Sequence, residues 1–279
     1  MWIVVTDLDG TLLNHGDYSW QGASEALQTL EACGIPVVFC TSKTRAEVEV
    51  LRCATGNRHP FIVENGGAVY FPETSFAHIL PDAPRRDGLI AVELGTPYAK
   101  LLAALADAVE ESACSVRGFG GASIPEVAEW CGFSEADASL AKAREYDEPF
   151  LFDGGDERRL LQAIEDRGLR WTRGGRFLHI LGRNDKGAAV RSLRAVYRES
   201  GVHPVIAALG DSPNDLPLLR EADFPLIMPA PRLAEMQAAL PHAHVAPAPG
   251  SIGWGEAVLH HLPEWLAAAR ALPGEGPKP

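Results

Sequence analysis

Short apolar runs alternate with helix-like segments at both ends of this chain. Trp2–Thr6, Ile35–Cys40 and Phe61–Val63 are apolar runs near the start, and Pro204–Leu209 is another near the end. Between them lie segments such as Ser24–Cys33, whose apolar residues recur at helical spacing. Strands that alternate with helices predict βαβ units joined in a parallel sheet. The sequence therefore predicts an α/β fold with a parallel-sheet core.

The middle of the chain follows a different pattern. From about residue 82 to residue 173 we expect one strand, a long helix, several shorter pieces and a further helix. A chain of 279 residues is also long for a single hydrophobic core. We therefore predict a core domain made of residues 1–81 and 174–279, with a smaller α/β domain inserted at residues 82–173. The last residues, 273–279, are predicted to be disordered.

The composition restricts the possible partners and the compartment. A formal net charge of −12 makes nucleic acid an unfavourable partner, so a site for an anionic substrate must be locally positive. The five cysteines are odd in number and form no CxxC pair, which favours reduced thiols in a cytoplasmic protein. The N-terminus resembles no signal peptide, and no apolar run reaches the ~20 residues of a membrane span. We expect a cytoplasmic protein that binds no membrane.

Two acidic residues directly follow the first apolar run. Asp7 and Asp9 are two residues apart, and Gly10 allows a sharp turn after them. Because ligands bind beyond the carboxyl ends of parallel strands, both carboxylates can converge on one ligand there. One carboxylate can attack phosphorus while the other transfers a proton. A plain acidic turn is the alternative; a calcium loop is excluded, since it needs glycine at Leu12 and glutamate at Tyr18.

A second acidic cluster follows the run Pro204–Leu209. Asp211 comes after a single glycine, and Asp215 lies four residues further along. At the tip of a parallel strand, Asp211 is expected beside Asp7 and Asp9. Three carboxylates near one point repel each other unless a cation neutralises them, and oxygen ligands favour Mg²⁺. Capping of the following helix is the alternative for Asp211 and Asp215.

Two further positions could bind phosphate. Lys186 opens a predicted helix, and its ammonium could neutralise phosphoryl oxygens; a solvated surface lysine is the alternative. Thr41 and Ser42 follow the run Ile35–Cys40, where a hydroxyl and backbone N–H groups at a helix N-terminus can hold phosphate. An ordinary helix cap is the alternative for the whole segment Thr41–Thr44.

These four sites, in this order, resemble the motifs of the haloacid dehalogenase superfamily of phosphatases, in its subclass IIB. The resemblance implies a Rossmann-like parallel-sheet core with an inserted smaller α/β cap, and a Mg²⁺ cofactor. It implies that Asp7 is the nucleophile and Asp9 the general acid/base. It implies that Lys186 and either Thr41 or Ser42 bind the phosphate. The implied metal ligands are Asp7, the backbone carbonyl of Asp9 and Asp211, with Asp215 in support.

A narrower resemblance is to the family of mannosyl-3-phosphoglycerate phosphatases. It is carried by Thr41–Arg45, Glu64–Gly67, Ala143–Phe150, Gly174–His179 and Gly210–Asp215. Many relatives in the broader subclass have Thr-Gly-Arg where this chain has Thr-Ser-Lys. The resemblance implies hydrolysis of mannosyl-3-phosphoglycerate to the compatible solute mannosylglycerate. The residues expected to bind substrate are Lys43, Glu64, Asn65, Gly121, Arg144, Gly175, Arg176, His179 and Asn214.

Other functions stay open at this point. The guanidinium groups of Arg144 and Arg176 suit a carboxylate, but single arginines are also common on any surface. Another sugar-phosphate phosphatase, for glucosyl-3-phosphoglycerate, sucrose phosphate or trehalose phosphate, fits the same motifs, and so does a phosphomutase. A signalling domain that accepts phosphate on Asp7 is an alternative of a different class. An inserted domain and the acid/base Asp9 both argue against it, because such a domain needs neither.

Overall fold

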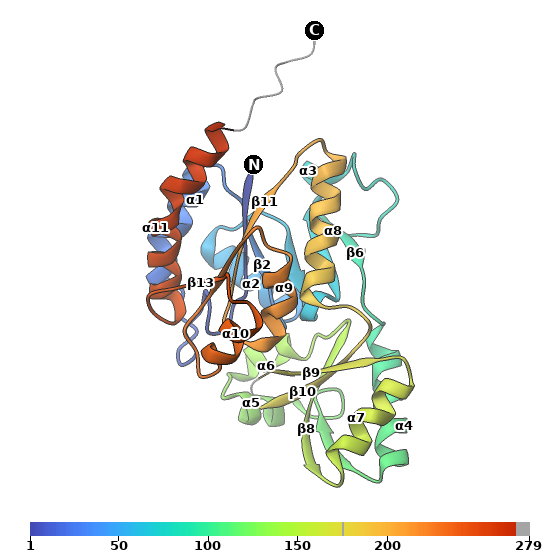
Figure 1. The fold of residues 1–279 in the computed structure, drawn as a ribbon. Coiled ribbons are helices and arrows are strands. Elements are labelled where there is room, and N and C mark those ends of the chain that lie inside the picture. Colours follow the sequence, from blue (N-terminus) through green and yellow to red (C-terminus); the bar gives the residue numbers. More distant parts are fainter. Residues whose placement is uncertain (175, 272–279) are drawn as a thin grey trace. The chain divides into compact units, whose positions relative to one another are not determined.

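A computed structural model describes residues 1–174 and 176–271 of the chain (Figure 1). The chain divides into two compact units, one made of Met1–Val38 with Arg194–Pro279 and the other of Phe39–Leu193. Strand β2 (Val37–Cys40) and helix α8 (Lys186–Glu199) each cross a boundary between the units. The tail predicted to be disordered and Gly175 lie outside the described residues.

The first unit contains a parallel sheet. Its strands run in the order β13-β12-β11-β1, with β2 next to β1, and every pairing among the first four is parallel. This confirms the predicted parallel core. The elements that complete the unit are β1 (Trp2–Thr6), η1 (Gln21–Ala23), α1 (Ser24–Ala32), β11 (Val205–Gly210), η3 (Pro213–Asp215), α9 (Leu216–Arg220), β12 (Phe224–Ile227), α10 (Leu233–Ala239), β13 (His244–Val245) and α11 (Gly250–Ala271).

Strand β1 is buried along its whole length, which explains its continuous apolar sequence. Helices α1 and α11 lie side by side in this unit (Figure 1). The indole of Trp254 on α11 donates a hydrogen bond to Thr6 Oγ1 at 2.9 Å. Trp265 on the same helix stacks on Trp2, with ring centroids 5.2 Å apart. These contacts fix the strand that carries Asp7 at its carboxyl end.

The second unit contains the remaining strands of the nine-stranded sheet and a separate four-stranded sheet. In the first, β2 pairs in parallel with β3, and β4, β6 and β5 continue in antiparallel order. The elements of this part are α2 (Arg45–Thr55), β3 (Phe61–Val63), η2 (Glu64–Gly66), β4 (Ala68–Pro72), α3 (Glu73–Phe76), β5 (Arg85–Arg86) and β6 (Leu89–Glu93).

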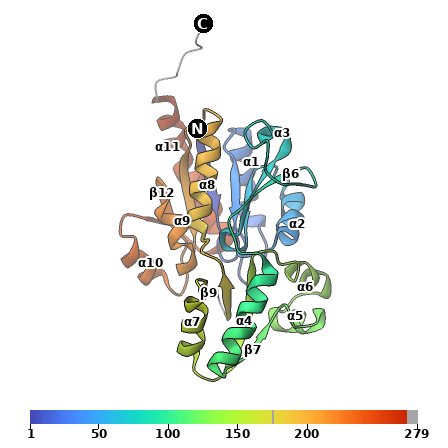
Figure 2. The same cartoon turned by 90° about the vertical axis from the view of Figure 1, so that its right-hand side faces the viewer.

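The other sheet of this unit is antiparallel and has four strands in the order β7-β8-β10-β9. Helices α4 and α7 pack together on it (Figure 2), around a core that includes Leu105, Phe150 and Ile164. The elements of this part are α4 (Tyr98–Ser112), β7 (Ser115–Gly118), α5 (Ile124–Cys131), α6 (Glu135–Ala141), β8 (Asp147–Gly154), α7 (Glu157–Asp166), β9 (Arg170–Gly174) and β10 (Phe177–Leu181).

The strand pairing crosses both predicted domain boundaries. β5 and β6 lie beyond residue 82 but pair with β4, whereas β10 lies beyond residue 173 but pairs with β8 and β9. Because strands on the two sides of residues 82 and 173 pair with each other, the strand pairing does not mark domain boundaries at these positions. The boundaries stay predictions. Within the described ranges, no helix combines the length and the apolar character that crossing a membrane requires.

Candidate active site

Two adjacent parallel strands bring the acidic residues of the first unit together. Thr6 at the end of β1 lies opposite Leu209 near the end of β11, and the N–H of Asp7 donates to the Leu209 carbonyl at 2.9 Å. Asp211 follows β11 directly. Because the two strands end at the same level, Asp7 and Asp211 meet at the edge where ligands bind in parallel sheets. The sequence predicted that Asp7 and Asp211 lie close together at this edge.

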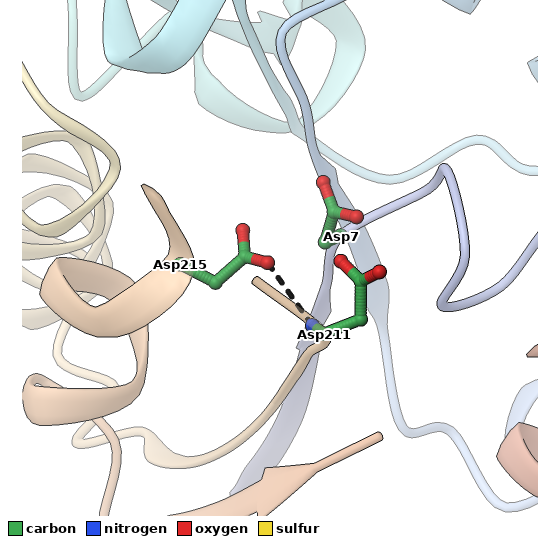
Figure 3. Close-up of side chains that lie close together, drawn as sticks. All are labelled: Asp7, Asp211 and Asp215. Atoms are coloured by element: carbon green, nitrogen blue, oxygen red, sulfur yellow. Dashed lines mark hydrogen bonds between the residues drawn. The ribbon is translucent and has the colours of Figure 1, made fainter. Parts of the chain in front are cut away.

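Asp7, Asp211 and Asp215 form an acidic cluster (Figure 3). Each offers a carboxylate oxygen that lies within 4.8 Å of the oxygens of the other two. The three residues are only 6%, 4% and 0% exposed, respectively. Buried carboxylates at this separation repel one another in a medium that screens charge poorly, so a cation would stabilise them. A donor set made only of carboxylate oxygens suits a hard cation such as Mg²⁺.

Asp215 has a second, structural contact. Its Oδ2 accepts the backbone N–H groups of Asp211 and Ser212, each at 3.1 Å. The side chain therefore fixes the turn that presents Asp211. Asn214 lies in the same turn, and its Oδ1 accepts a hydrogen bond from the Ser212 hydroxyl.

Gly10 is required by the turn after β1. Its φ is +79°, and a Cβ at this position would lie 2.5 Å from Asp211 Oδ2 and 2.3 Å from His15 Nε2. No side chain fits between the turn and the acidic cluster. Asp9 begins this turn and is not a member of the three-residue cluster. Its predicted metal contact through the backbone carbonyl stays a prediction.

His15 is a residue that the sequence analysis missed. Its Nε2 lies 3.1 Å from Asp211 Oδ2, and its side chain is 66% exposed. Thr11 was missed too: its hydroxyl is buried and has no hydrogen-bond partner among the described residues. The position of Thr11 directly after Gly10 was a signal for it, whereas nothing in the local sequence around His15 points toward Asp211.

In the second unit, Thr41 and Ser42 follow β2 as expected. Helix α2 is capped by Thr44, which forms a capping box with Glu47. The alternative expected for the segment Thr41–Thr44, an ordinary helix cap, is therefore present at Thr44, and neither Thr41 nor Ser42 is the capping residue. Thr41 Oγ1 accepts the backbone N–H of Lys43 at 3.2 Å, and the two hydroxyls stay equal candidates for phosphate binding.

Lys186 begins helix α8 and is only 1% exposed. A solvated surface lysine is excluded by this burial, because a buried ammonium needs an anionic or polar environment. The loop after β3 approaches this point closely. Gly66 has a φ of +85°, and a Cβ there would lie 2.2 Å from the Asp185 carbonyl oxygen.

Glu64 and Asn65 contact the segment 145–147. The Glu64 carboxylate accepts the N–H of Glu145 at 2.9 Å and the N–H of Tyr146 at 2.7 Å. Burial raises the pKa of Glu64 to about 8, although Arg144 and these N–H groups act in the opposite direction. Asn65 donates through Nδ2 to Asp147 Oδ2 at 2.7 Å. Both residues thus hold another segment of the chain, which was not expected from the sequence.

The remaining predicted residues differ in their surroundings. The Arg144 guanidinium donates to the carbonyls of Ala141 at 2.8 Å and Ser42 at 2.7 Å, so it is not an ordinary surface charge. Arg176 is exposed, and its guanidinium lies over the neighbouring Phe177 ring.

Three other predicted substrate-binding residues complete the set. Gly121 is exposed with open space around it. Lys43 lies 3.8 Å from Glu47, measured between Nζ and Oε1. His179 contacts Asp147 through Nδ1 at 2.8 Å.

Comparison with known proteins identifies the family. Residues 4–81 match the family described as haloacid dehalogenase-like hydrolase. A protein of Methanococcoides burtonii named glucosyl-3-phosphoglycerate/mannosyl-3-phosphoglycerate phosphatase is 39% identical over 260 residues, which is 92% of this chain and 96% of the relative. A protein of Persephonella marina with the same name is 38% identical over 267 residues, or 94% of this chain and 97% of the relative.

Solved structures share the fold. A protein of Thermoplasma acidophilum superimposes with a TM-score of 0.68 at 19% identity, covering 93% of this chain and 97% of the other. A sugar phosphatase of haloacid dehalogenase subclass IIB superimposes with a TM-score of 0.64 at 14% identity, covering 95% and 100%. These likenesses confirm the predicted α/β architecture, a Rossmann-like parallel-sheet core with an inserted smaller cap.

The fold, the acidic cluster and the named relatives together define a phosphoric monoester hydrolase. The chain belongs to the haloacid dehalogenase family of hydrolases. The family resemblance expected from the sequence is thereby confirmed.

Proposed function

We propose that this phosphatase hydrolyses mannosyl-3-phosphoglycerate to mannosylglycerate and phosphate, through a phospho-aspartate formed on Asp7. The observation that carries the proposal is the buried cluster of Asp7, Asp211 and Asp215 at the ends of two adjacent parallel strands. It occurs in a chain whose relatives, at 38–39% identity, are named for this activity.

The proposed cofactor is Mg²⁺. The carboxylates of Asp7 and Asp211, with the backbone carbonyl of Asp9, would hold it, and Asp215 would support the turn. When bound, the ion would neutralise charge on the phosphate oxygens. The fit rests on the donor set, because the cluster found among the described residues consists of three buried carboxylates, which suit a hard cation.

The chain's own residues perform the chemistry in two steps. The Asp7 carboxylate attacks phosphorus, so that a bond from its oxygen to phosphorus forms while the ester bond breaks. Asp9 donates its proton to the departing alkoxide. In the second step Asp9 takes a proton from water, and the resulting hydroxide attacks the aspartyl phosphate and restores Asp7. Lys186, with Thr41 or Ser42, is proposed to bind the phosphate oxygens.

Substrate recognition is proposed for the residues outside this centre. Two donors of the Arg144 guanidinium bind carbonyls, which orients the group and leaves its other N–H groups for the glycerate carboxylate. Arg176 is the second candidate for that carboxylate. The other proposed substrate-binding residues are Lys43, Glu64, Asn65, Gly121, Gly175, His179 and Asn214.

Glucosyl-3-phosphoglycerate is the second candidate substrate, because the names of both relatives include it. It shares the phosphate and carboxylate and differs only in the sugar. Sucrose phosphate and trehalose phosphate lack the carboxylate and are disfavoured. A phosphomutase would return the phosphate to a sugar and release none into solution.

The test is phosphate release from a panel of these esters, with p-nitrophenyl phosphate as a small reference. The wild-type enzyme should prefer phosphoglycerate glycosides. Arg144→Ala or Arg176→Ala should remove that preference and keep activity on the reference, because an unpaired buried carboxylate costs about 2–5 kcal/mol. A wild-type enzyme that ignores phosphoglycerate glycosides would refute the proposed substrate, though not the phosphatase activity.

The proposed function also concerns the domain organisation of the chain and the cellular role of its product. Residues 82–173 are proposed as the cap domain, with the core formed by residues 1–81 and 174–279. The product would be a compatible solute made in the cytoplasm, and the substrate partner is a small phosphorylated glycoside rather than nucleic acid.

A further inference from the structure

A buried carboxylate in the second unit holds two side chains that are far away in the sequence. Asp147 begins β8, and its Oδ1 lies 2.8 Å from His179 Nδ1 on β10. Its Oδ2 accepts a hydrogen bond from Asn65 Nδ2 at 2.7 Å. Asp147, His179 and Asn65 are 0%, 6% and 4% exposed. Each carboxylate oxygen therefore has its own donor, and the three side chains form a fixed chain of contacts.

The electrostatics keep Asp147 ionised. Burial alone would raise its pKa, but His179, Arg144 and the Asn65 amide lower it below the ordinary value of an aspartate. An ionised carboxylate only accepts hydrogen bonds, so the contact requires that His179 carries a proton on Nδ1. In a neutral imidazole the other nitrogen, Nε2, is then a bare acceptor.

The second ring nitrogen of His179, Nε2, lies beside a glycine. The contact of His179 with Asp147 is made through Nδ1, and His179 is 6% exposed. Gly174 lies against it, and a Cβ at that position would be 3.2 Å from Nε2. The missing methyl group at Gly174 leaves room for a donor to approach.

We propose that Asp147 is a positioning residue that, together with Asn65, holds His179 in the tautomer whose Nε2 accepts a hydrogen bond from a hydroxyl of the substrate's glycosyl or glyceryl part. This inference rests on the proposed function, since it assigns the hydroxyl to a phosphorylated glycoside. It makes the Asp147 carboxylate, which does not itself touch substrate, a determinant of specificity.

The perturbation is Asp147→Asn, which keeps the shape and exchanges one acceptor for a donor. An amide cannot accept from both Asn65 and His179. If its oxygen stays with Asn65, its NH₂ group faces His179 Nδ1 and moves the ring proton to Nε2. The nitrogen that should accept the hydroxyl then donates instead. We expect kcat/KM for mannosyl-3-phosphoglycerate to fall about 10- to 100-fold, mostly through KM, with little change for p-nitrophenyl phosphate.

The direct readout is the ¹⁵N chemical shift of the His179 ring nitrogens, assigned by the signal lost in His179→Gln. At a pH where the ring is neutral, the wild-type ring should carry its proton on Nδ1 and the Asp147→Asn ring should carry it on Nε2. The double variant Asn65→Asp/Asp147→Asn restores a complementary set of donors and acceptors. It should return the proton to Nδ1, which tests the positioning role separately from any contact of Asn65 with the substrate.

A matched control is Asp153→Asn on the same strand, at an exposed position where the carboxylate pairs with Arg117. It should change neither the tautomer of His179 nor the selectivity. Equal losses on both substrates in Asp147→Asn, or an unchanged tautomer, would overturn the positioning role and leave a merely structural contact. A wild-type enzyme without preference for phosphoglycerate glycosides would instead overturn the proposed function and this inference with it.

Discussion

Gly10→Ala tests whether the turn after β1 builds the acidic cluster. The added Cβ would lie 2.5 Å from Asp211 Oδ2 and 2.3 Å from His15 Nε2. His15 is exposed and can move away, whereas Asp211 is buried and can give way only by leaving its position. The positive φ of +79° adds a backbone cost of about 1–2 kcal/mol for any residue with a side chain. Two losses should therefore appear together, one in stability and one in metal-dependent activity.

The expected decrease in melting temperature is about 2–8 °C, from the backbone cost alone. The Mg²⁺ concentration for half-maximal phosphate release should rise by about tenfold or more, because Asp211 is displaced. Gly16→Ala is the control, since Gly16 lies in the same loop without a positive φ, and a Cβ added there would meet no atom within 4 Å. Equal stability and equal Mg²⁺ dependence in Gly10→Ala and Gly16→Ala would refute this reasoning.

Three other predictions follow from the site. Chelation by EDTA should abolish phosphate release and Mg²⁺ should restore it, whereas full activity in excess chelator would contradict the metal requirement. Asp9→Asn should slow the phosphorylation step far more with a sugar phosphate than with p-nitrophenyl phosphate, because nitrophenolate leaves without a proton; equal losses in this step would remove Asp9 from the acid role. Because the pKa of Glu64 is raised from 4.5 to about 8, its contribution to the free energy of unfolding should be largest below pH 4.5 and fall between pH 4.5 and 8, by up to about 1.4 kcal/mol per pH unit. Denaturant titrations should show this slope in the wild type and in the exposed-site control Glu110→Gln but not in Glu64→Gln; the same slope in all three would contradict it.

The parallel core could be predicted because its strands are locally encoded. The run Trp2–Thr6 is the whole of β1, and Phe61–Val63 is the whole of β3. Strands buried on both faces are continuously apolar, so they stand out without knowledge of their partners. The meeting of Asp7 and Asp211 then follows from adjacent parallel strands, which end at one edge.

The antiparallel sheet was harder to predict, because its strands are only partly buried. β8 is buried over its first four residues and partly exposed thereafter, with acidic residues at both ends of its sequence. The contacts of Asp147 with Asn65 and His179 span 82 and 32 residues. Such pairings depend on register and loop geometry, which local periodicity does not encode. The burial of Lys186 likewise became clear only from the three-dimensional structure.

The nucleophilic role of Asp7 is tested most directly by mass spectrometry of the enzyme, acid-quenched during turnover. The Asp9→Asn variant turning over p-nitrophenyl phosphate is the best background, because its phosphorylation needs no acid while slow attack by water should allow the phosphoryl-enzyme to accumulate. We predict one added phosphoryl group, on the peptide that contains Asp7, and none after Asp7→Asn, which should also lack turnover while keeping its fold. Phosphate release by Asp7→Asn at a rate near that of the wild type, or a phosphoryl group on a different peptide, would contradict the mechanism.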